Sequence, residues 1–124
     1  MSEGTDRVAP ALRVLLVEDE SLVAFLLEEM LTELGHSVVG PVARVSKGVE
    51  AAQREEIDFA ILDVNVNGEE AYPIADALAA RGIPFAFSTG YAQKSLRGAY
   101  RDRPTVHKPF LLSDLRKLFA GVFG

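Results

Sequence analysis

The chain has 124 residues, a net charge of −5 and 48% apolar residues, which is the balance of a soluble globular protein. This length fits one domain, and no apolar run approaches the roughly 20 residues that span a bilayer. Cysteine is absent, which excludes disulfides, thiolate metal sites and cysteine nucleophiles. Residues 1–10 hold no apolar segment, so we expect no signal peptide, a disordered N-terminal arm, one folded domain over residues 11–124 and a cytoplasmic location.

Short apolar runs alternate with amphipathic stretches along the rest of the chain. The run LRVLLV at residues 12–17 is too uniformly apolar for a one-sided strand, which indicates a strand buried on both faces. Further strands are predicted at residues 37–40, 58–63, 84–89 and 105–108. Helices are predicted at residues 21–34, 45–54, 71–80 and 112–123, and residues 91–103 indicate only a short or fluctuating helix.

Local signals refine these boundaries. In the first helix the apolar residues at helical spacing predict the buried face, with glutamates on the opposite face; they are Leu22, Phe25, Leu26, Met30 and Leu34. Gly35 and Gly82 are expected to end their helices. Pro41 is expected to begin a loop, and Ser113 to cap the last helix.

Five strands that alternate with five helices predict an α/β fold with a parallel sheet covered on both faces. At this size the common solution is the flavodoxin-like, doubly wound (βα)5 fold with strand order 2-1-3-4-5. Ligands then bind at the carboxyl ends of the first and third strands.

Those two strands both end in carboxylates. Glu18 and Asp19 follow the first strand, and Asp63 ends the third. Neighbouring strands lie about 4.8 Å apart, so the three acids are expected to crowd together and repel. A hard divalent cation removes that repulsion, which favours a Mg²⁺ site that handles phosphate. The alternative is three solvated loop carboxylates.

Two more strand ends contribute to the same edge. Ser88 and Thr89 end the fourth strand with hydroxyl groups, and Lys108 follows the fifth strand. The lysine supplies a positive charge to phosphate oxygens. Pro109 fixes the next turn, and we expect it to hold Lys108 through a cis bond.

Residues 12–123 resemble the receiver domains of two-component response regulators, on the motifs VED after the first strand, LDVN after the third, STG after the fourth and KPF after the fifth. The resemblance implies that Asp63 accepts a phosphoryl group from a histidine kinase or phosphotransfer protein. It also implies Mg²⁺ bound by Asp19, Asp63 and the backbone carbonyl of Asn65, with Glu18 as the second member of the acidic pair.

The resemblance assigns the remaining pocket residues as well. Thr89 matches the switch hydroxyl, and Lys108 matches the lysine that reaches the phosphoryl group. The stretch PFAFSTGY resembles the Phe-Ala-Thr-Gly-Tyr subgroup of stand-alone alphaproteobacterial receivers, in which Gly90 and Tyr91 follow the switch hydroxyl. This match implies single-domain signalling without an output domain, and no enzymatic role beyond self-phosphorylation and self-dephosphorylation.

One position departs from the family pattern. Most receivers carry Phe or Tyr three residues before the lysine, where this chain has Thr105. Because residue 105 is not aromatic, it cannot report the movement of Thr89 as the aromatic residue of most receivers does. Residues 91–103 are the predicted substitute.

Charge is uneven along the chain, with sixteen acids and five bases in residues 1–80 but two acids and eight bases in residues 81–124. The basic part predicts a surface that steers an acidic protein partner, and not nucleic acid or a membrane. That partner is either the upstream kinase or phosphotransfer protein or a downstream target. Its residues are Arg97, Arg101, Arg103, Arg116 and Lys117.

Several alternatives stay open. A degenerate receiver that binds proteins without phosphorylation is one. A phosphohydrolase of the haloacid-dehalogenase type is disfavoured because Asn65 stands where its second aspartate is required. Neither histidine is expected to be catalytic: His36 is expected to face solvent, and His107 to be packed or at the surface.

Overall fold

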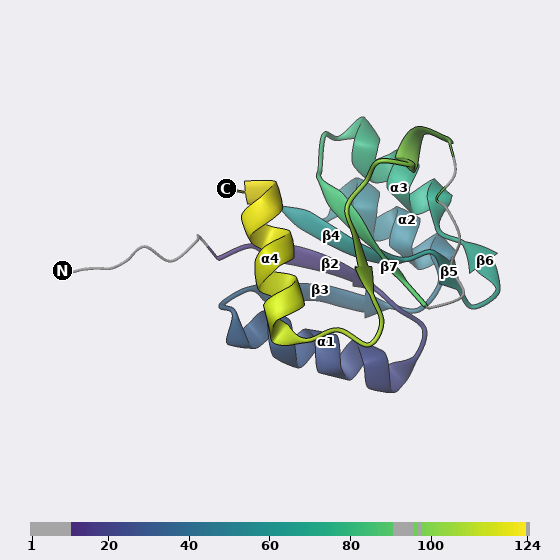
Figure 1. Ribbon diagram of the computed structural model, residues 1–124. Coiled ribbons are helices and arrows are strands. Elements are labelled where there is room, and N and C mark those ends of the chain that lie inside the picture. Colours follow the sequence, from purple (N-terminus) through teal and green to yellow (C-terminus); the bar gives the residue numbers. More distant parts are fainter. Residues whose placement is uncertain (1–10, 91–95, 97, 124) are drawn as a thin grey trace.

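The structure, a computed structural model, describes residues 11–90, 96 and 98–123. Its centre is a five-stranded parallel sheet with the order β3–β2–β4–β7–β8 (Figure 1). These strands are β2 (Arg13–Val17), β3 (Ser37–Val42), β4 (Phe59–Asp63), β7 (Phe85–Thr89) and β8 (Thr105–His107). Counted along the chain, the order is 2-1-3-4-5, so the predicted flavodoxin-like α/β fold is confirmed.

Helices cover both faces of the sheet (Figure 1). α1 (Ser21–Glu33) and α4 (Leu112–Phe123) pack on one face, and α2 (Val45–Arg54) and α3 (Tyr72–Ala80) pack on the other. The central strand β4 contributes alternate residues to the two apolar cores, as period-two side chains require. None of the helices in the described part of the chain has the length and apolar character needed to cross a membrane.

The connection from β7 to β8 is the part that the sequence defined least. Residues 91–95 and 97 of the predicted short helix lie outside the described residues, as does the predicted arm over residues 1–10. The described part of the connection holds a single 3₁₀ turn, η1 (Gly98–Tyr100), followed by turn residues.

The expectation that Pro41 begins a loop is wrong, because β3 continues through it to Val42. β3 is an edge strand, so the missing N–H of proline leaves no partner unpaired. Gly40 has φ +101°, and the β2–β3 register shifts between Leu15 and Val17. A Cβ at Gly40 would lie 3.0 Å from the carbonyl oxygen of Leu16, so this bulge requires glycine.

The predicted buried face of α1 is correct only in part, because Met30 and Leu34 are half-buried and pack on the core whereas other predicted residues are exposed. Leu22 is 70% exposed and Phe25 56% exposed, whereas Ala24, Leu27 and Leu31 are buried against the sheet. Apolar residues surround the first two turns of this helix, so periodicity alone fits more than one face. Packing selects the residues at positions i, i+3 and i+7 and leaves an apolar surface uncovered.

Helix ends follow the predictions in part. Gly35 (φ +93°) and Gly82 (φ +70°) follow α1 and α3 in the left-handed conformation, as expected. Ser113 does not cap α4, because the helix already begins at Leu112. Instead, the Asp114 carboxylate accepts a 2.7 Å hydrogen bond from the backbone N–H of Leu111, which is one half of a capping box.

Candidate functional site

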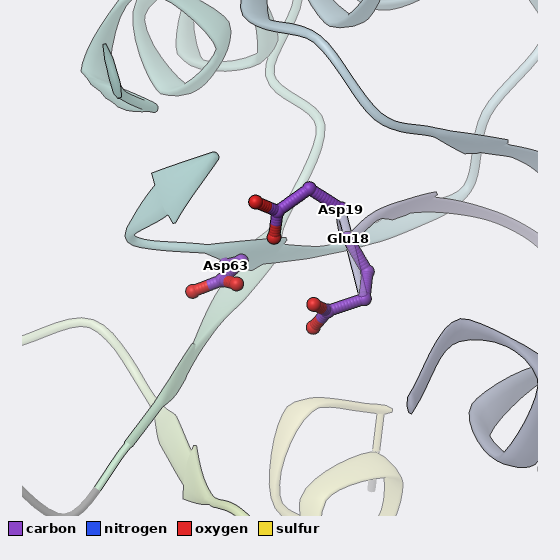
Figure 2. Close-up of side chains that lie close together, drawn as sticks. All are labelled: Glu18, Asp19 and Asp63. Carbon is purple, nitrogen blue, oxygen red and sulfur yellow. The ribbon is translucent and has the colours of Figure 1, made fainter. Parts of the chain in front are cut away.

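Three carboxyl groups converge at the carboxyl end of the sheet (Figure 2). Parallel pairing of Val17 with Leu62 places the next residues on the two strands, Glu18 and Asp63, beside one another. One carboxylate oxygen from each of Glu18, Asp19 and Asp63 lies within 4.8 Å of the others. Glu18 and Asp63 are buried, whereas Asp19 is exposed. The predicted acidic cluster is therefore present.

The side chain of Lys108 bridges two of these acids. Its Nζ lies 2.9 Å from Asp63 Oδ2 and 2.9 Å from Glu18 Oε1. Only 16% of the lysine side chain is exposed, against 12% for Asp63 and none for Glu18. The peptide bond from Lys108 to Pro109 is cis, as predicted, and Pro109 itself is exposed. The cation therefore offsets the repulsion that the converging acids would otherwise have.

Burial and pairing set the protonation of this group. Burial raises the pKa of Glu18, and hydrogen bonds from Lys108 and the backbone N–H of Glu20 only partly oppose it. Burial alone would lower the pKa of Lys108, but hydrogen bonds to Glu18 and Asp63 outweigh it and raise the lysine pKa. The lysine therefore stays charged, and it places a positive charge beside the Asp63 carboxylate.

A small hairpin that the sequence analysis did not predict fixes the third acid. β5 (Asn65–Val66) and β6 (Glu69–Glu70) pair through Asn67 and Gly68, which both have positive φ, +52° and +84°. An Asn-Gly pair in this conformation is typical of a type I′ turn. The backbone N–H of Asn67 donates a 2.8 Å hydrogen bond to Asp19 Oδ2. Asn65 is exposed at the start of the hairpin.

Thr89 and Ser88 end β7 beside the acidic cluster, and both are buried. Asp63 pairs in register with Ser88, whose Oγ has no hydrogen-bond partner in the described part of the chain. The Thr89 hydroxyl lies 3.1 Å from Nδ1 of His107. His107, which the sequence analysis set aside, is thus in direct contact with a predicted site residue. The contact follows from the register of β7 and β8, which pairs Thr89 with His107 and for which the sequence alone carries no signal.

An aromatic cluster surrounds Phe87, which lies two residues before Thr89 on the same face of β7. Tyr100 in η1 contacts Phe87, Phe85 and Tyr72, with its ring stacked on that of Tyr72. The hydroxyl of Tyr100 donates a hydrogen bond to the Asp76 carboxylate. Thr105 is exposed. An aromatic from the β7–β8 connection therefore packs against β7, while β8 contributes none from Thr105.

The remaining predicted residues are dispersed. Gly90 is exposed, and Tyr91 and Arg97 lie outside the described residues. Arg101, Arg116 and Lys117 are exposed. Arg103 is half-buried, and its guanidinium carbon lies 4.2 Å from the centre of the Phe85 ring. Arg103 therefore packs against the core in addition to carrying surface charge.

His36 does not face solvent as expected. It is buried, its Nδ1 accepts a 3.1 Å hydrogen bond from the backbone N–H of Leu12, and its ring lies 4.7 Å from that of Phe119. Burial lowers the pKa of His36. The side chain is a neutral part of the core, away from the acidic cluster.

Next to the acidic cluster lies an apolar cavity of about 330 Å³. Its lining joins the first turns of α1 to the segment after β8; the lining residues are Glu20, Val23, Leu26, Met30, Gly90, Lys108, Pro109 and Phe110. The exposed side chains Leu22, Phe25 and Leu111 extend the apolar character outward along the same two elements. The acidic cluster therefore has an apolar rim on the α1 side.

The arrangement can bind a small, hard cation and hold an anionic group. Carboxylate oxygens are ligands that Mg²⁺ prefers, and a phosphate oxygen completes such a shell. The Lys108 ammonium supplies a positive charge next to Asp63, and a carboxylate in that setting can act as a nucleophile.

Comparisons with known proteins point to one protein family. The family model for the response regulator receiver domain matches residues 14–120. The curated phyllosphere-induced regulator PhyR of Methylorubrum extorquens is 32% identical over 107 residues, which are 81% of this chain and 39% of that protein. This chain thus spans about two fifths of that relative's length.

Two solved structures are similar over nearly the whole chain. The solution structure of SdrG from Sphingomonas melonis Fr1 is 42% identical with a TM-score of 0.83, and the match covers 92% of this chain and 98% of that one. The solution structure of the BeF3-activated conformation of SdrG from Pseudomonas melonis Fr1 is 42% identical with a TM-score of 0.77, covering 90% and 96%.

Proposed function

The chain belongs to the response regulator receiver domain family, and we propose that it is a Mg²⁺-dependent phosphoacceptor whose acceptor is Asp63. The observation that carries the proposal is the convergence of three carboxylates with Lys108, whose Nζ lies 2.9 Å from Asp63 Oδ2. The activated state described for the relative SdrG supports it, because beryllofluoride is a mimic of a phosphoryl group.

Asp19, Asp63 and the backbone carbonyl of Asn65 would hold the ion, with Glu18 beside them. The donor set fits Mg²⁺, because the cluster offers three carboxylate oxygens within 4.8 Å and, among the described residues, includes no nitrogen or sulfur ligand. When bound, the ion neutralises charge on the phosphoryl oxygens and leaves the transfer itself to the protein side chains.

Asp63 then acts as the nucleophile: one carboxylate oxygen forms a bond to phosphorus while the bond from phosphorus to the histidine nitrogen of the donor protein breaks. Lys108 already lies against Asp63, so its charge meets an incoming phosphoryl oxygen without a large movement. The phosphoryl group brings about −1.5 to −2 of charge and three acceptor oxygens. We propose that Thr89 donates its hydroxyl to one of these oxygens, and that this movement shifts the protein between two partner-binding states.

The aromatic cluster is the proposed readout. Phe87 lies two residues before Thr89 on β7, and Tyr100 packs against Phe87 with ring centres 6.2 Å apart. A shift of Thr89 would therefore be felt by η1 through β7. In this proposal Tyr100 takes the role that most receivers give to the aromatic residue at the position of Thr105.

The proposed partners are proteins. A histidine kinase or phosphotransfer protein supplies the phosphoryl group, and a target protein responds to it. The apolar rim formed by Leu22, Phe25, Leu26 and Leu111 borders the acidic cluster, which suits a donor protein that must bring its phosphoryl group to Asp63. The exposed bases Arg101, Arg116 and Lys117 suit an acidic partner.

The test is incubation with acetyl phosphate and Mg²⁺, followed by intact mass measurement of four proteins. We expect a phosphoryl adduct on the unmodified chain and on Asp102→Asn, which changes an exposed acid outside the cluster. We expect no adduct on Asp63→Asn and a strongly reduced yield on Asp19→Asn. An adduct of equal yield on Asp63→Asn would place the acceptor elsewhere. No adduct on any protein would favour a receiver that binds partners without phosphorylation.

A further inference from the structure

His107 is in direct contact with the proposed switch, and none of the assigned roles includes it. It lies on the edge strand β8 and is exposed, whereas its partner Thr89 is only 4% exposed. The two residues are register partners, and the Thr89 hydroxyl lies 3.1 Å from His107 Nδ1. Among the described residues, no hydrogen bond joins Thr89 to Asp63.

We infer that His107 is a positioning residue that holds the Thr89 hydroxyl toward β8 until a phosphoryl group competes for it. This inference rests on the proposed function of Asp63. The pair can be arranged with Nδ1 as the acceptor of the hydroxyl hydrogen or with Nδ1–H as the donor to the hydroxyl oxygen. Only the first arrangement uses the hydroxyl hydrogen, so the inference takes Nδ1 of His107 as the acceptor of that hydrogen.

A backbone hydrogen bond next to the Thr89–His107 pair holds the two strands in place. The backbone N–H of Lys108 donates a 2.8 Å hydrogen bond to the carbonyl oxygen of Thr89, which fixes the two strand ends relative to one another. The Thr89 side chain is therefore the part that can still move. A hydrogen bond to an anionic phosphoryl oxygen is stronger than one between neutral groups, so the phosphoryl group wins the competition.

Competition of this kind multiplies the affinity for the phosphoryl group by the fraction of molecules in which Thr89 is free of His107. Removing the imidazole should therefore strengthen the binding of a phosphoryl mimic. We expect His107→Leu to bind beryllofluoride in the presence of Mg²⁺ about fivefold more tightly than the unmodified chain, as expected for the loss of one competing neutral hydrogen bond.

The experiment is a double-mutant cycle with beryllofluoride titrations in excess Mg²⁺, followed by ¹H–¹⁵N NMR of the Gly90 amide. His107→Leu should bind more tightly, and His107→Asn, which keeps a hydrogen-bonding side chain, should stay close to the unmodified chain. Thr105→Val, at an exposed position on the same face of β8, is the matched control and should not change the affinity. In a Thr89→Val background, His107→Leu should have no further effect, because its partner is gone.

A second measurement needs no phosphoryl mimic. The imidazole ¹⁵N shifts of His107 should change on Thr89→Val and, in the unmodified chain, on addition of Mg²⁺ and beryllofluoride. Unchanged shifts on Thr89→Val, equal affinity of His107→Leu and the unmodified chain, or an effect of His107→Leu that persists in the Thr89→Val background would each overturn the inference.

Failure of the proposed function gives a different result. If the unmodified chain binds no beryllofluoride while its His107 shifts still respond to Thr89→Val, the contact exists but the proposed phosphoacceptor role is wrong, and the inference is overturned with it. If beryllofluoride binds but the cycle shows no coupling, the proposed function stands and only the role of His107 is refuted.

Discussion

Replacement of Lys108 by methionine tests the electrostatics of the acidic cluster. The variant keeps an unbranched apolar side chain but removes the charge that lies 2.9 Å from both Glu18 and Asp63. The carboxylate oxygens lie within 4.8 Å of one another. At an effective dielectric constant of 20, two charges at that distance repel by about 3.5 kcal/mol. Removing one partner of a buried ion pair has a similar measured cost, about 3–5 kcal/mol.

We therefore expect the free energy of unfolding of Lys108→Met to fall by about 3 kcal/mol in EDTA at neutral pH. For a chain of this length the entropy of unfolding is about 0.26 kcal/mol/K, so the midpoint of thermal unfolding should fall by about 11 °C. Circular dichroism during heating measures it. Mg²⁺ replaces the missing positive charge, and at about one hundred times its dissociation constant it should return about 2.7 kcal/mol.

The matched control is Lys47→Met. Lys47 Nζ lies 3.7 Å from Glu50 Oε1, but both side chains are more than half exposed. An exposed pair of this kind contributes at most about 0.5 kcal/mol, so the midpoint should shift by about 2 °C or less. Equal shifts of the two variants in EDTA would refute the reasoning, and so would Mg²⁺ that stabilises Lys108→Met no more than the unmodified chain.

Three further predictions concern the rest of the fold. Gly48→Ala should lower the free energy of unfolding by about 1 kcal/mol, because the new Cβ would lie 2.3 Å from the Cδ1 atom of Ile74 and the overpacking outweighs the gain in helix propensity. At the control position Gly121 no atom lies within 4 Å of a new Cβ, so Gly121→Ala should raise the free energy of unfolding by up to about 1 kcal/mol. Urea unfolding measures both changes. Burial lowers the pKa of His36, so on acidification the unfolded chain binds a proton at a higher pH than the folded chain does. The stabilising contribution of His36 should therefore be complete above about pH 6.5 and fall as the pH drops below it. In His36→Gln this dependence of the free energy of unfolding on pH should be weaker. Burial and a carboxylate partner raise the pKa of Tyr100 to about 12. The stability that this tyrosine contributes should therefore be present below about pH 10 and be lost between about pH 10 and 12. A Tyr100→Phe variant should not show this loss in an alkaline titration of stability, and an identical loss in both proteins would contradict the assignment.

The sheet and the acidic cluster could be predicted because few alternatives satisfy the sequence. Each of β2, β4 and β7 is a short run of apolar residues, and such runs between helices require a parallel sheet. Once the strand order follows, the carboxyl ends of β2 and β4 must meet. The proximity of Glu18 to Asp63 is therefore a consequence of topology and needs no knowledge of side-chain rotamers.

The features that the sequence did not predict depend on choices between similar packings. The buried face of α1 is predicted only in part, because apolar residues surround its first two turns, and packing on the sheet selects Leu27 and Leu31. The burial of His36 depends on contacts with the backbone of Leu12, twenty-four residues away in the chain, and with the ring of Phe119 in α4. The contact between Thr89 and His107 depends on register, which spacing along one chain does not define.

The hydrogen bond between Asp19 and the hairpin links the orientation of one acid to the shape of a distant turn. The donor is the backbone N–H of Asn67, forty-eight residues further along the chain, and that residue has φ +52°. Because the main chain makes the contact, the identity of the side chain at this position matters only through the backbone conformation it permits. A substitution that removes the left-handed conformation at residue 67 would therefore redirect the Asp19 carboxylate while every acidic residue of the cluster stays in the sequence.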